Sequence, residues 1–328
     1  MNMHIRTFSL GALCILIGIS LNAVFAEPLP RCLFVSSYHP GYAWSDGVEK
    51  GLRETLAGRC ELEQFDLDTK RIKDPVQIEK KITAVRRLIE YSRPDVVITA
   101  DDNAAKYLIQ PYYINSETPF VFCGINWSAE NYGFPASNVT GMIEVAPIKP
   151  LMEWAQRLAP PARTATYIGA DTLTERKNYG RYKVLGEKMG IDITPRFAPT
   201  SAEWKQHYID AQQSDFVIMG SNAGINDWQS EALIQSLPEH TKRLSITVHQ
   251  WMMPYSVLGF TKIPEEQGIW AGKTALAIIE QDIKPIDIPV VANRLWDIWI
   301  NSQLISATGI DLPARLQQKA KFMSVTSP

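Results

Sequence analysis

The chain has 328 residues, of which 45% are hydrophobic and 21% charged, and its formal net charge at pH 7 is -2. These values are typical of a soluble globular protein that is long enough for two domains of ordinary size. The near-neutral charge and the lack of a Lys/Arg stripe argue against nucleic acid as a partner, and they give no support to polybasic membrane contact.

The first residues have the pattern of a secretory signal peptide. His4 and Arg6 give a weakly basic start, and residues 8–21 are apolar but too short for a comfortable membrane span. Val24-Phe25-Ala26 then supplies a small-residue cleavage pattern. We therefore expect residues 1–26 to be removed and the mature chain to be exported to the periplasm, with an uncleaved anchor as the alternative.

Export would leave three cysteines in an oxidising compartment: Cys32, Cys60 and Cys123. Cys32 and Cys60 each open a predicted strand, and consecutive strands in this kind of topology usually pair. We expect a disulfide between them, provided that the geometry allows it, and Cys123 would stay free. The sequence has no Cys-x-x-Cys, which argues against a zinc site and a redox motif.

Strand-like and helix-like segments alternate from Cys32 onward. The strands are continuously apolar rather than alternating, which is typical of a parallel sheet covered by helices on both faces. The elements expected in the first half are a strand over 33–35, a helix over 46–56, a strand over 62–65, a longer helix that begins at Asp74-Pro75, a strand over 95–100, a short helix to Ile109 and a strand over 119–123.

Residues 138–144 are interpreted as a crossover, after which the same alternation restarts. The elements expected there are strands over 164–168, 192–196, 215–219 and 244–248, and helices over 148–155, 179–189, 204–211, 227–236 and 265–279. Residues 289–313 are harder to place, and we expect them to return to or cross a hinge.

The sequence thus predicts an α/β protein of two doubly wound lobes with parallel sheets, whose strand ends face each other across a cleft. The expected boundaries are 27–143 for the N-terminal lobe and 144–258 for the C-terminal lobe. A return segment, 259–328, would contribute to both lobes, because two domains joined only once would hold a cleft poorly.

Polar and aromatic side chains follow the carboxyl ends of the predicted strands, which is where ligands bind in open α/β sheets. The amide groups of the candidates can both donate and accept hydrogen bonds, and the aromatic rings would bury a flat or apolar ligand. The candidates are Ser36, Ser37, Tyr38, Tyr42, Trp44, Asp101, Asp102, Asn103, Gly124, Asn126, Trp127, Asp171, Ser221, Asn222 and His249.

Several of these candidates have a purely structural alternative. The acidic run that begins at Asp101 could cap a helix, since carboxylates complement the free N–H groups at a helix start. Asn126 and Asn222 could serve simple turns at strand ends. Some of the aromatic residues could be packing or lid residues.

The sequence gives little support to catalysis. It contains no Gly-x-Ser-x-Gly, no His-Glu-x-x-His, no Gly-x-x-x-x-Gly-Lys-Ser/Thr, and no Gly-x-Gly-x-x-Gly after the first strand. Ser36 or Ser37 would need a base, but His39 is too near in sequence and His249 would have to reach across the cleft. We expect no enzymatic activity, no cofactor and no metal.

Four segments carry a family resemblance: LFVSSYHPGYAWSDGVEKGL, PDVVITADDNAAKYL, TPFVFCGINW and INSQLISATGIDLPARLQQKA. In this order and spacing they resemble the periplasmic substrate-binding proteins of ABC transporters, in the branch that includes tryptophan- and tyrosine-type binders. Related domains resemble the extracytoplasmic sensing portions of membrane histidine kinases and diguanylate cyclases, and the HPGYAW stretch is closer to these sensor-associated members.

The resemblance implies a type I periplasmic-binding fold, in which two flavodoxin-like lobes are joined by three crossovers and close on a ligand. The family's site residues would match Ser36, Ser37, Tyr38, Asp101, Asp102, Asn103, Gly124 and Asn126 in the first lobe, and Asp171, Ser221, Asn222 and His249 in the second. The acidic pair, the amide side chains and the aromatic rings fit a small amino acid-like or aromatic solute, but they also fit purine-like or hydroxylated compounds. The implied partner is an ABC permease or, alternatively, a membrane sensor protein.

Overall fold

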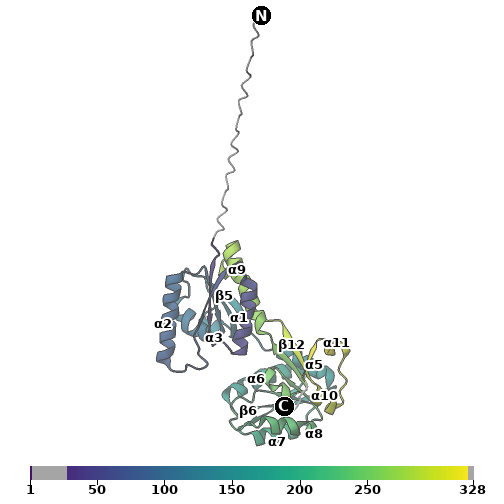
Figure 1. The fold of residues 1–328 in the computed structure, drawn as a ribbon. Helices are drawn as coiled ribbons and strands as arrows, with labels where there is room; N and C mark the ends of the chain where they lie inside the picture. The colour runs from purple at the N-terminus through teal and green to yellow at the C-terminus, as the bar shows by residue number, and fades with distance from the viewer. Residues whose placement is uncertain (2–27, 324–328) are drawn as a thin grey trace.

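The computed structural model describes Met1 and residues 28–323. The expected signal peptide therefore lies, apart from Met1, outside the described residues. Residues 28–323 form two α/β lobes that lie one above the other (Figure 1). In these residues, no helix combines the length and the apolar character that crossing a bilayer requires.

The first lobe is built on a six-stranded parallel sheet with the strand order β11-β5-β4-β3-β1-β2. Its central strands are buried at nearly every position, because helices cover both faces of the sheet. The strands are β1 (Arg31–Ser36), β2 (Glu61–Asp66), β3 (Val96–Ala100), β4 (Phe120–Asn126), β5 (Val139–Glu144) and β11 (Val291–Ala292).

The two faces of this sheet hold separate hydrophobic clusters, and β1 contributes alternately to each. Leu33 and Val35 pack towards α2, whereas Cys32 and Phe34 pack towards α1 and α9. The helices of this lobe are α1 (Ala43–Leu56), α2 (Pro75–Ser92), α3 (Asp101–Ala104), a π-helical turn over Ala105–Ile109, α4 (Gln110–Tyr112) and α9 (Pro264–Gln281).

A disulfide joins the starts of β1 and β2. Cys32 lies in β1, and Cys60 directly precedes β2, which pairs in parallel with β1. Their Cα atoms are 6.0 Å apart. Cys123, on β4, is a free and buried thiol.

The second lobe is built on a seven-stranded sheet with the order β13-β12-β10-β9-β8-β6-β7, in which only the β10–β12 pair is antiparallel. The largest buried side chains of its core include Trp204, Tyr167 and Tyr208. The strands are β6 (Thr164–Ala170), β7 (Asp192–Ala198), β8 (Phe216–Met219), β9 (Leu244–Thr247), β10 (Leu258–Lys262), β12 (Trp296–Asn301) and β13 (Ala320–Met323). The helices are α5 (Ile148–Leu158), α6 (Leu173–Met189), α7 (Ser201–Ala211), α8 (Ser230–His240), α10 (Ser302–Thr308) and α11 (Ala314–Gln317).

The predicted α/β class with two mostly parallel sheets is confirmed, but several strands differ from the sequence-based expectation: β11, β12 and β13 were not predicted, and neither were β5 and β10. Residues 138–144, expected as a crossover, form β5, and the crossover begins only after Glu144. Gly141 interrupts the apolar run of β5, because a Cβ at this position would lie 2.3 Å from the carbonyl oxygen of Phe122. Strand β10 was not expected, and it sits in the second sheet at the start of the return segment.

The chain passes between the lobes three times: after β5, between β10 and α9, and between β11 and β12. The return helix α9 packs closely on α1 in the first lobe (Figure 1). Glycines allow this approach, since a Cβ at Gly268 would lie 2.0 Å from the carbonyl oxygen of Val48. The same holds for Gly51, where a Cβ would lie 2.4 Å from the carbonyl oxygen of Glu265.

Hydrogen bonds fasten the three crossing segments to one another. The Val145 N–H donates to Asn293 Oδ1 over 2.7 Å, and Asn293 Nδ2 donates back to the Val145 carbonyl over 3.2 Å. The Glu266 carboxylate accepts from the backbone N–H groups of Arg294 and Leu295 at 2.8 and 2.9 Å. The crossings therefore form one small hinge region rather than three separate linkers.

Candidate functional site

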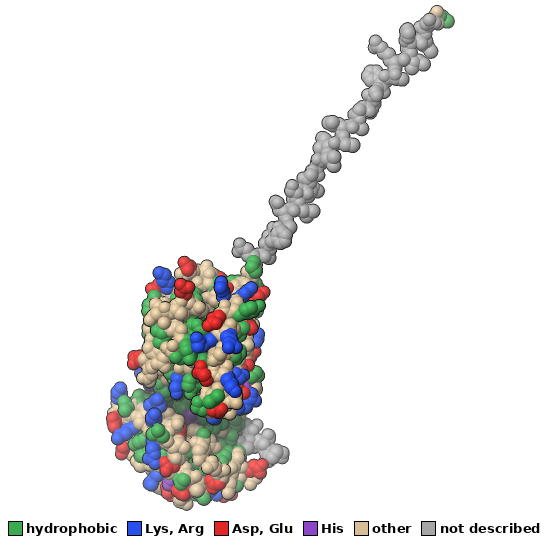
Figure 2. Space-filling view, turned by 90° about the vertical axis from the view of Figure 1, so that its left-hand side faces the viewer, with side chains coloured by type: hydrophobic (Ala, Val, Ile, Leu, Met, Phe, Trp, Pro, Cys, Tyr) green, Lys and Arg blue, Asp and Glu red, His purple; other side chains and the backbone are tan. Residues whose placement is uncertain are grey.

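A cavity of about 380 Å3 lies between the two lobes, and both lobes contribute to its walls. Figure 2 shows the recess between the lobes from the side. The first lobe contributes residues that follow β1, β2 and β3 and the last residues of β4 and β5. The second lobe contributes residues at the ends of β9 and β10. The lining residues are Tyr38, Tyr42, Ala43, Trp44, Lys70, Asp101, Asn126, Glu144, Val248, His249, Gln250, Trp251, Thr261, Lys262 and Pro264.

Asp101 is the most deeply buried carboxyl group of this cavity, with 3% of its surface exposed. It directly follows β3 and has a left-handed backbone with φ of 69°, which is costly for a residue other than glycine. Its Oδ1 accepts a hydrogen bond from the Trp44 indole N–H over 3.0 Å, whereas its buried Oδ2 has no hydrogen-bond partner within residues 28–323. Burial raises the pKa of Asp101 to about 7, and the neighbouring charge of Asp102 adds to this rise.

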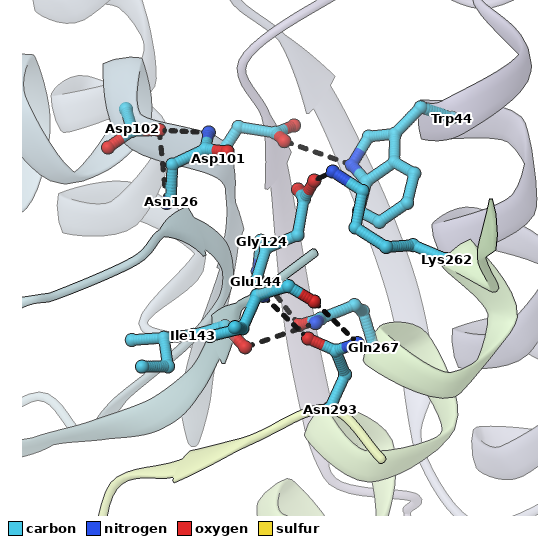
Figure 3. A network of polar contacts seen from close by, with 11 residues as sticks. Trp44, Asp101, Asp102, Gly124, Asn126, Ile143, Glu144, Lys262, Gln267 and Asn293 are labelled. Carbon is cyan, nitrogen blue, oxygen red and sulfur yellow. Dashed lines mark hydrogen bonds and ion pairs between the residues drawn. The ribbon is translucent and has the colours of Figure 1, made fainter. Parts of the chain in front are cut away.

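Gly124 makes room for this carboxyl group. It lies at a bulge in β4 with φ of 73°, and a Cβ there would lie 3.0 Å from Asp101 Oδ1. Its N–H donates to Gln267 Oε1 of α9 over 2.9 Å, as Figure 3 shows. Gly124 therefore supports the position of Asp101 rather than lining the cavity itself.

An ion pair at the hinge forms another part of the cavity wall. Glu144 is the last residue of β5 and Lys262 the last residue of β10, so the pair joins the starts of two crossings (Figure 3). Lys262 Nζ also lies 5.3 Å from the centroid of the Trp44 ring. Burial lowers the pKa of Lys262 to about 8, and this fall is opposed by the charge of Asp101.

Aromatic rings line the cavity on both sides. On the first lobe, the rings of Tyr38 and Tyr42 meet edge to face at 5.2 Å, and Lys70 Nζ lies 4.4 and 4.8 Å from their centroids. On the second lobe, the rings of His249 and Trp251 lie 4.6 Å apart.

His249, on the second lobe, is an uncharged polar group of the cavity wall. Burial lowers the pKa of His249 to about 4, so this imidazole is neutral at pH 7 and can both donate and accept a hydrogen bond. The cavity thus offers flat apolar surface together with a few polar groups, as is typical of small-molecule sites.

The structure gives the predicted serines a structural role at the end of β1. Ser37 is fully buried, and its Oγ donates to the Ala100 carbonyl over 2.5 Å and accepts from the Ala104 N–H over 2.8 Å. The Ser36 Oγ accepts from the Tyr38 N–H over 3.3 Å. Both hydroxyls shape the turns next to the cavity and do not line it.

Asp102 and Asn103 also bind within their own lobe. Asp102 accepts hydrogen bonds from Asn126 Nδ2 over 2.7 Å and from the Tyr132 hydroxyl over 2.8 Å. Asn103 Nδ2 donates to Thr69 Oγ1 over 2.8 Å. Of these residues only Asn126 reaches the cavity, and Asp102 fixes its amide group.

Trp127 connects the two lobes next to the cavity instead of lining it. Its ring packs against the hydrophobic core of the second lobe and lies 4.0 Å from the guanidinium group of Arg181 on α6. Its backbone is left-handed, with φ of 65°, and its N–H donates to the Glu144 carbonyl over 2.9 Å.

The remaining second-lobe candidates lie outside the cavity wall. Asp171 is exposed and forms an ion pair with Arg176. Ser221 is buried, and its N–H donates to the buried carboxylate of Glu175 over 2.8 Å. Asn222 accepts from the Ile225 N–H through its carbonyl, which is a turn contact.

Several cavity residues were not predicted from the sequence, among them Lys70, Glu144, Thr261 and Lys262. Glu144 and Lys262 are the last residues of β5 and β10, so the strand-end rule would have found them had these two strands been predicted. Nothing in the sequence pattern singles out Lys70, which lies on the loop between β2 and α2. Among the residues that the structure describes, no group of three His, Cys, Asp or Glu side chains could hold a metal ion.

No protein-family model matches the chain, and no curated protein matches it in sequence. Solved structures do match. An open, ligand-free substrate-binding protein with adhesive properties from Clostridium difficile is 13% identical with a TM-score of 0.70, covering 91% of this chain and 100% of its own. An ABC domain in complex with L-Trp from Streptococcus pneumonia is 16% identical with a TM-score of 0.59 and the same coverage.

A periplasmic ribose ABC transporter protein from Conexibacter woesei is 12% identical with a TM-score of 0.57, covering 89% of this chain and 98% of its own. At identities of 12% to 16%, these matches show the fold and not the ligand. The fold is that of type I periplasmic binding proteins. This chain is similar to such proteins over nearly its whole described length.

Proposed function

We propose that the chain is an exported, non-enzymatic solute-binding protein that captures a small molecule between its lobes. The single observation that carries the proposal is the cavity between the lobes. Its wall includes Asp101, a carboxyl group with one buried oxygen that has no hydrogen-bond partner among the described residues. Buried polar atoms normally have a hydrogen-bond partner, so an unpartnered carboxyl oxygen on a residue of the cavity wall favours a ligand that donates a hydrogen bond to it.

The walls favour an amino acid-like or aromatic solute. Rings from both lobes would cover a flat group, and polar groups of Asn126 and His249 would orient it. The structural neighbours with bound L-Trp and with a ribose transport role are consistent with a small polar ligand. The three hinge crossings would allow the lobes to close over the solute.

Delivery of the solute to an ABC permease in the membrane is the leading role for the closed form. The alternative is that the closed form signals to a membrane histidine kinase or diguanylate cyclase. One observation favours this alternative: Tyr42 and Trp44, from the segment that resembles sensor-associated proteins, line the cavity. Cells that lack the chain separate the two roles, because only transport predicts that uptake of the ligand falls.

A melting screen of the mature chain against amino acids, aromatic compounds and sugars tests the solute-binding role. A ligand present at about 100 times its Kd should stabilise the protein by about 2.7 kcal/mol. Tyr38→Leu should reduce this shift, whereas the matched control Tyr91→Leu should keep it, because Tyr91 is 90% exposed and lies outside the cavity. The proposal fails if no compound shifts the melting temperature, or if the two variants respond alike.

A further inference from the structure

The unpartnered oxygen of Asp101 narrows the chemical class of the ligand, an inference that rests on the proposed solute-binding function. We propose that Asp101 receives a protonated amine of the solute, so that the site selects amines over neutral molecules of the same shape. The amine enters as a hydrogen-bond donor and as a positive charge in direct contact, which no Lys, Arg or His within residues 28–323 supplies through an ion pair.

The geometry of Asp101 leaves one position for such a group. Oδ1 is occupied by the Trp44 indole N–H, and Oδ2 is buried and free. No Lys, Arg or His within residues 28–323 forms an ion pair with this carboxylate. A buried carboxylate with a single neutral donor is costly to ionise, and an ammonium group supplies a charge-assisted hydrogen bond that offsets this cost.

The charges of two lysines that border the cavity, Lys70 and Lys262, lower the pKa of Asp101, but neither lysine forms an ion pair with it. Lys262, from β10, forms its ion pair with Glu144, from β5. Lys70, from the loop after β2, lies over the rings of Tyr38 and Tyr42.

The other titratable groups near Asp101 bring no positive charge. Asp102, next in the chain, adds negative charge, and its oxygens bind Asn126 and Tyr132. The phenol of Tyr38 and the buried thiol of Cys123 both have raised pKa values, so both are neutral at pH 7. His249, on the opposite lobe, is neutral as well. Among the residues that the structure describes, none therefore places a positive charge in direct contact with Asp101, and a ligand ammonium group would supply it.

Other donors fit this position less well. A hydroxyl group would hydrogen-bond to Oδ2 but would leave the carboxylate charge without a counter-charge. A ligand carboxylate would be repelled.

Binding of an amine changes the protonation of Asp101. Burial holds the pKa of Asp101 at about 7, so near pH 6 most molecules carry a neutral carboxyl group there. An entering ammonium group favours the ionised form, and the carboxyl proton leaves to solvent. Binding of an amine near pH 6 should therefore release close to one proton, and this release should fade above pH 8.

Isothermal titration with matched probes tests the assignment. Tryptamine and tyramine are compared with tryptophol and tyrosol, in which a hydroxyl replaces the ammonium group. L-Tryptophan and indole-3-propionate form a second pair, which differs in the amine while both keep the carboxylate. We expect each amine to bind at least about 100-fold more tightly than its partner, because the site would otherwise leave a buried group unpaired.

Asp101→Asn should reduce this preference to a few-fold, while Asp171→Asn, an exposed control outside the cavity, should keep it. Near pH 6, the binding heat of an amine to the wild-type protein should vary with the ionisation enthalpy of the buffer. Circular dichroism and melting of Asp101→Asn establish that the variant is folded.

The amine assignment is overturned if an alcohol binds as tightly as its amine, if Asp101→Asn keeps the preference, or if only amine-free compounds bind. In each of these cases solute binding itself stands. If no probe and no compound of the melting screen binds, both the assignment and the proposed function fail.

Discussion

Replacing Asp101 by Asn should change how the stability of the ligand-free protein depends on pH. Asp101 is 3% exposed, and burial raises its pKa from 3.8 to about 7. The folded state therefore holds this proton more tightly than the unfolded state between these two values. Its contribution to stability is greatest below pH 3.8 and is lost as the pH rises towards 7.

The size of this pH dependence follows from the shift in the pKa of Asp101. A difference of about 3 pKa units corresponds to roughly 4 kcal/mol in total, of which about 3 kcal/mol falls between pH 5 and pH 8. Asn keeps an oxygen for the Trp44 N–H but does not titrate, so this part of the pH dependence should vanish. The Asn amide also leaves one buried donor unpaired, at a cost of about 1–3 kcal/mol. This cost lowers the free energy of unfolding equally at every pH and so does not change its slope against pH.

Urea unfolding, followed by far-UV circular dichroism from pH 5 to pH 8, measures this slope. The free energy of unfolding of wild-type protein and of the control Asp171→Asn should fall, relative to Asp101→Asn, by about 3 kcal/mol across the range. The reasoning is refuted if wild type and Asp101→Asn lose or gain stability in parallel, because Asp101 would then ionise as freely in the folded protein as in the unfolded chain.

Three further substitutions probe other parts of the structure. His249→Gln should flatten the loss of stability on acidification from pH 6.5 to about 4, because the folded protein resists protonation of His249 in that window; an unchanged acid limb in urea unfolding speaks against its burial. Glu144→Gln should cost about 3 kcal/mol by leaving the Lys262 ammonium unpaired, and Glu144→Gln with Lys262→Met should recover most of it; equal melting of the single variant and wild type contradicts this. Cys32→Ser with Cys60→Ser should lower stability by about 3 kcal/mol through the lost closure of a 28-residue loop, and a melting point insensitive to both the substitutions and reductant would count against that role.

The fold could largely be predicted from the sequence where the strands are continuous apolar runs. Strands β1, β3 and β4 are of this kind, and each is followed by polar residues at the edge that the cavity occupies. Strands β5 and β10 were not predicted, because each contains a glycine that is in close contact with a neighbouring residue. At Gly259 of β10, for example, a Cβ would lie 2.2 Å from Met253 Sδ. Periodicity cannot reveal such contacts.

The site could be predicted only in part, because the strand-end rule locates an edge of the sheet and not the direction of each side chain. Tyr38 and Asp101 reach the cavity. Ser37 and Asn103 lie at the same edge of the sheet, but their side chains form hydrogen bonds within the first lobe. Lys262 could not be found, because it depends on a strand that was not predicted.

A crystal structure of the protein with the compound that stabilises it most tests directly whether the cavity holds a solute between the lobes. We expect the compound to lie between the aromatic rings of the two lobes, with a nitrogen within about 3 Å of Asp101 Oδ2. The compound bound on an outer surface, with the interlobe cavity filled by water alone, would contradict the proposed function.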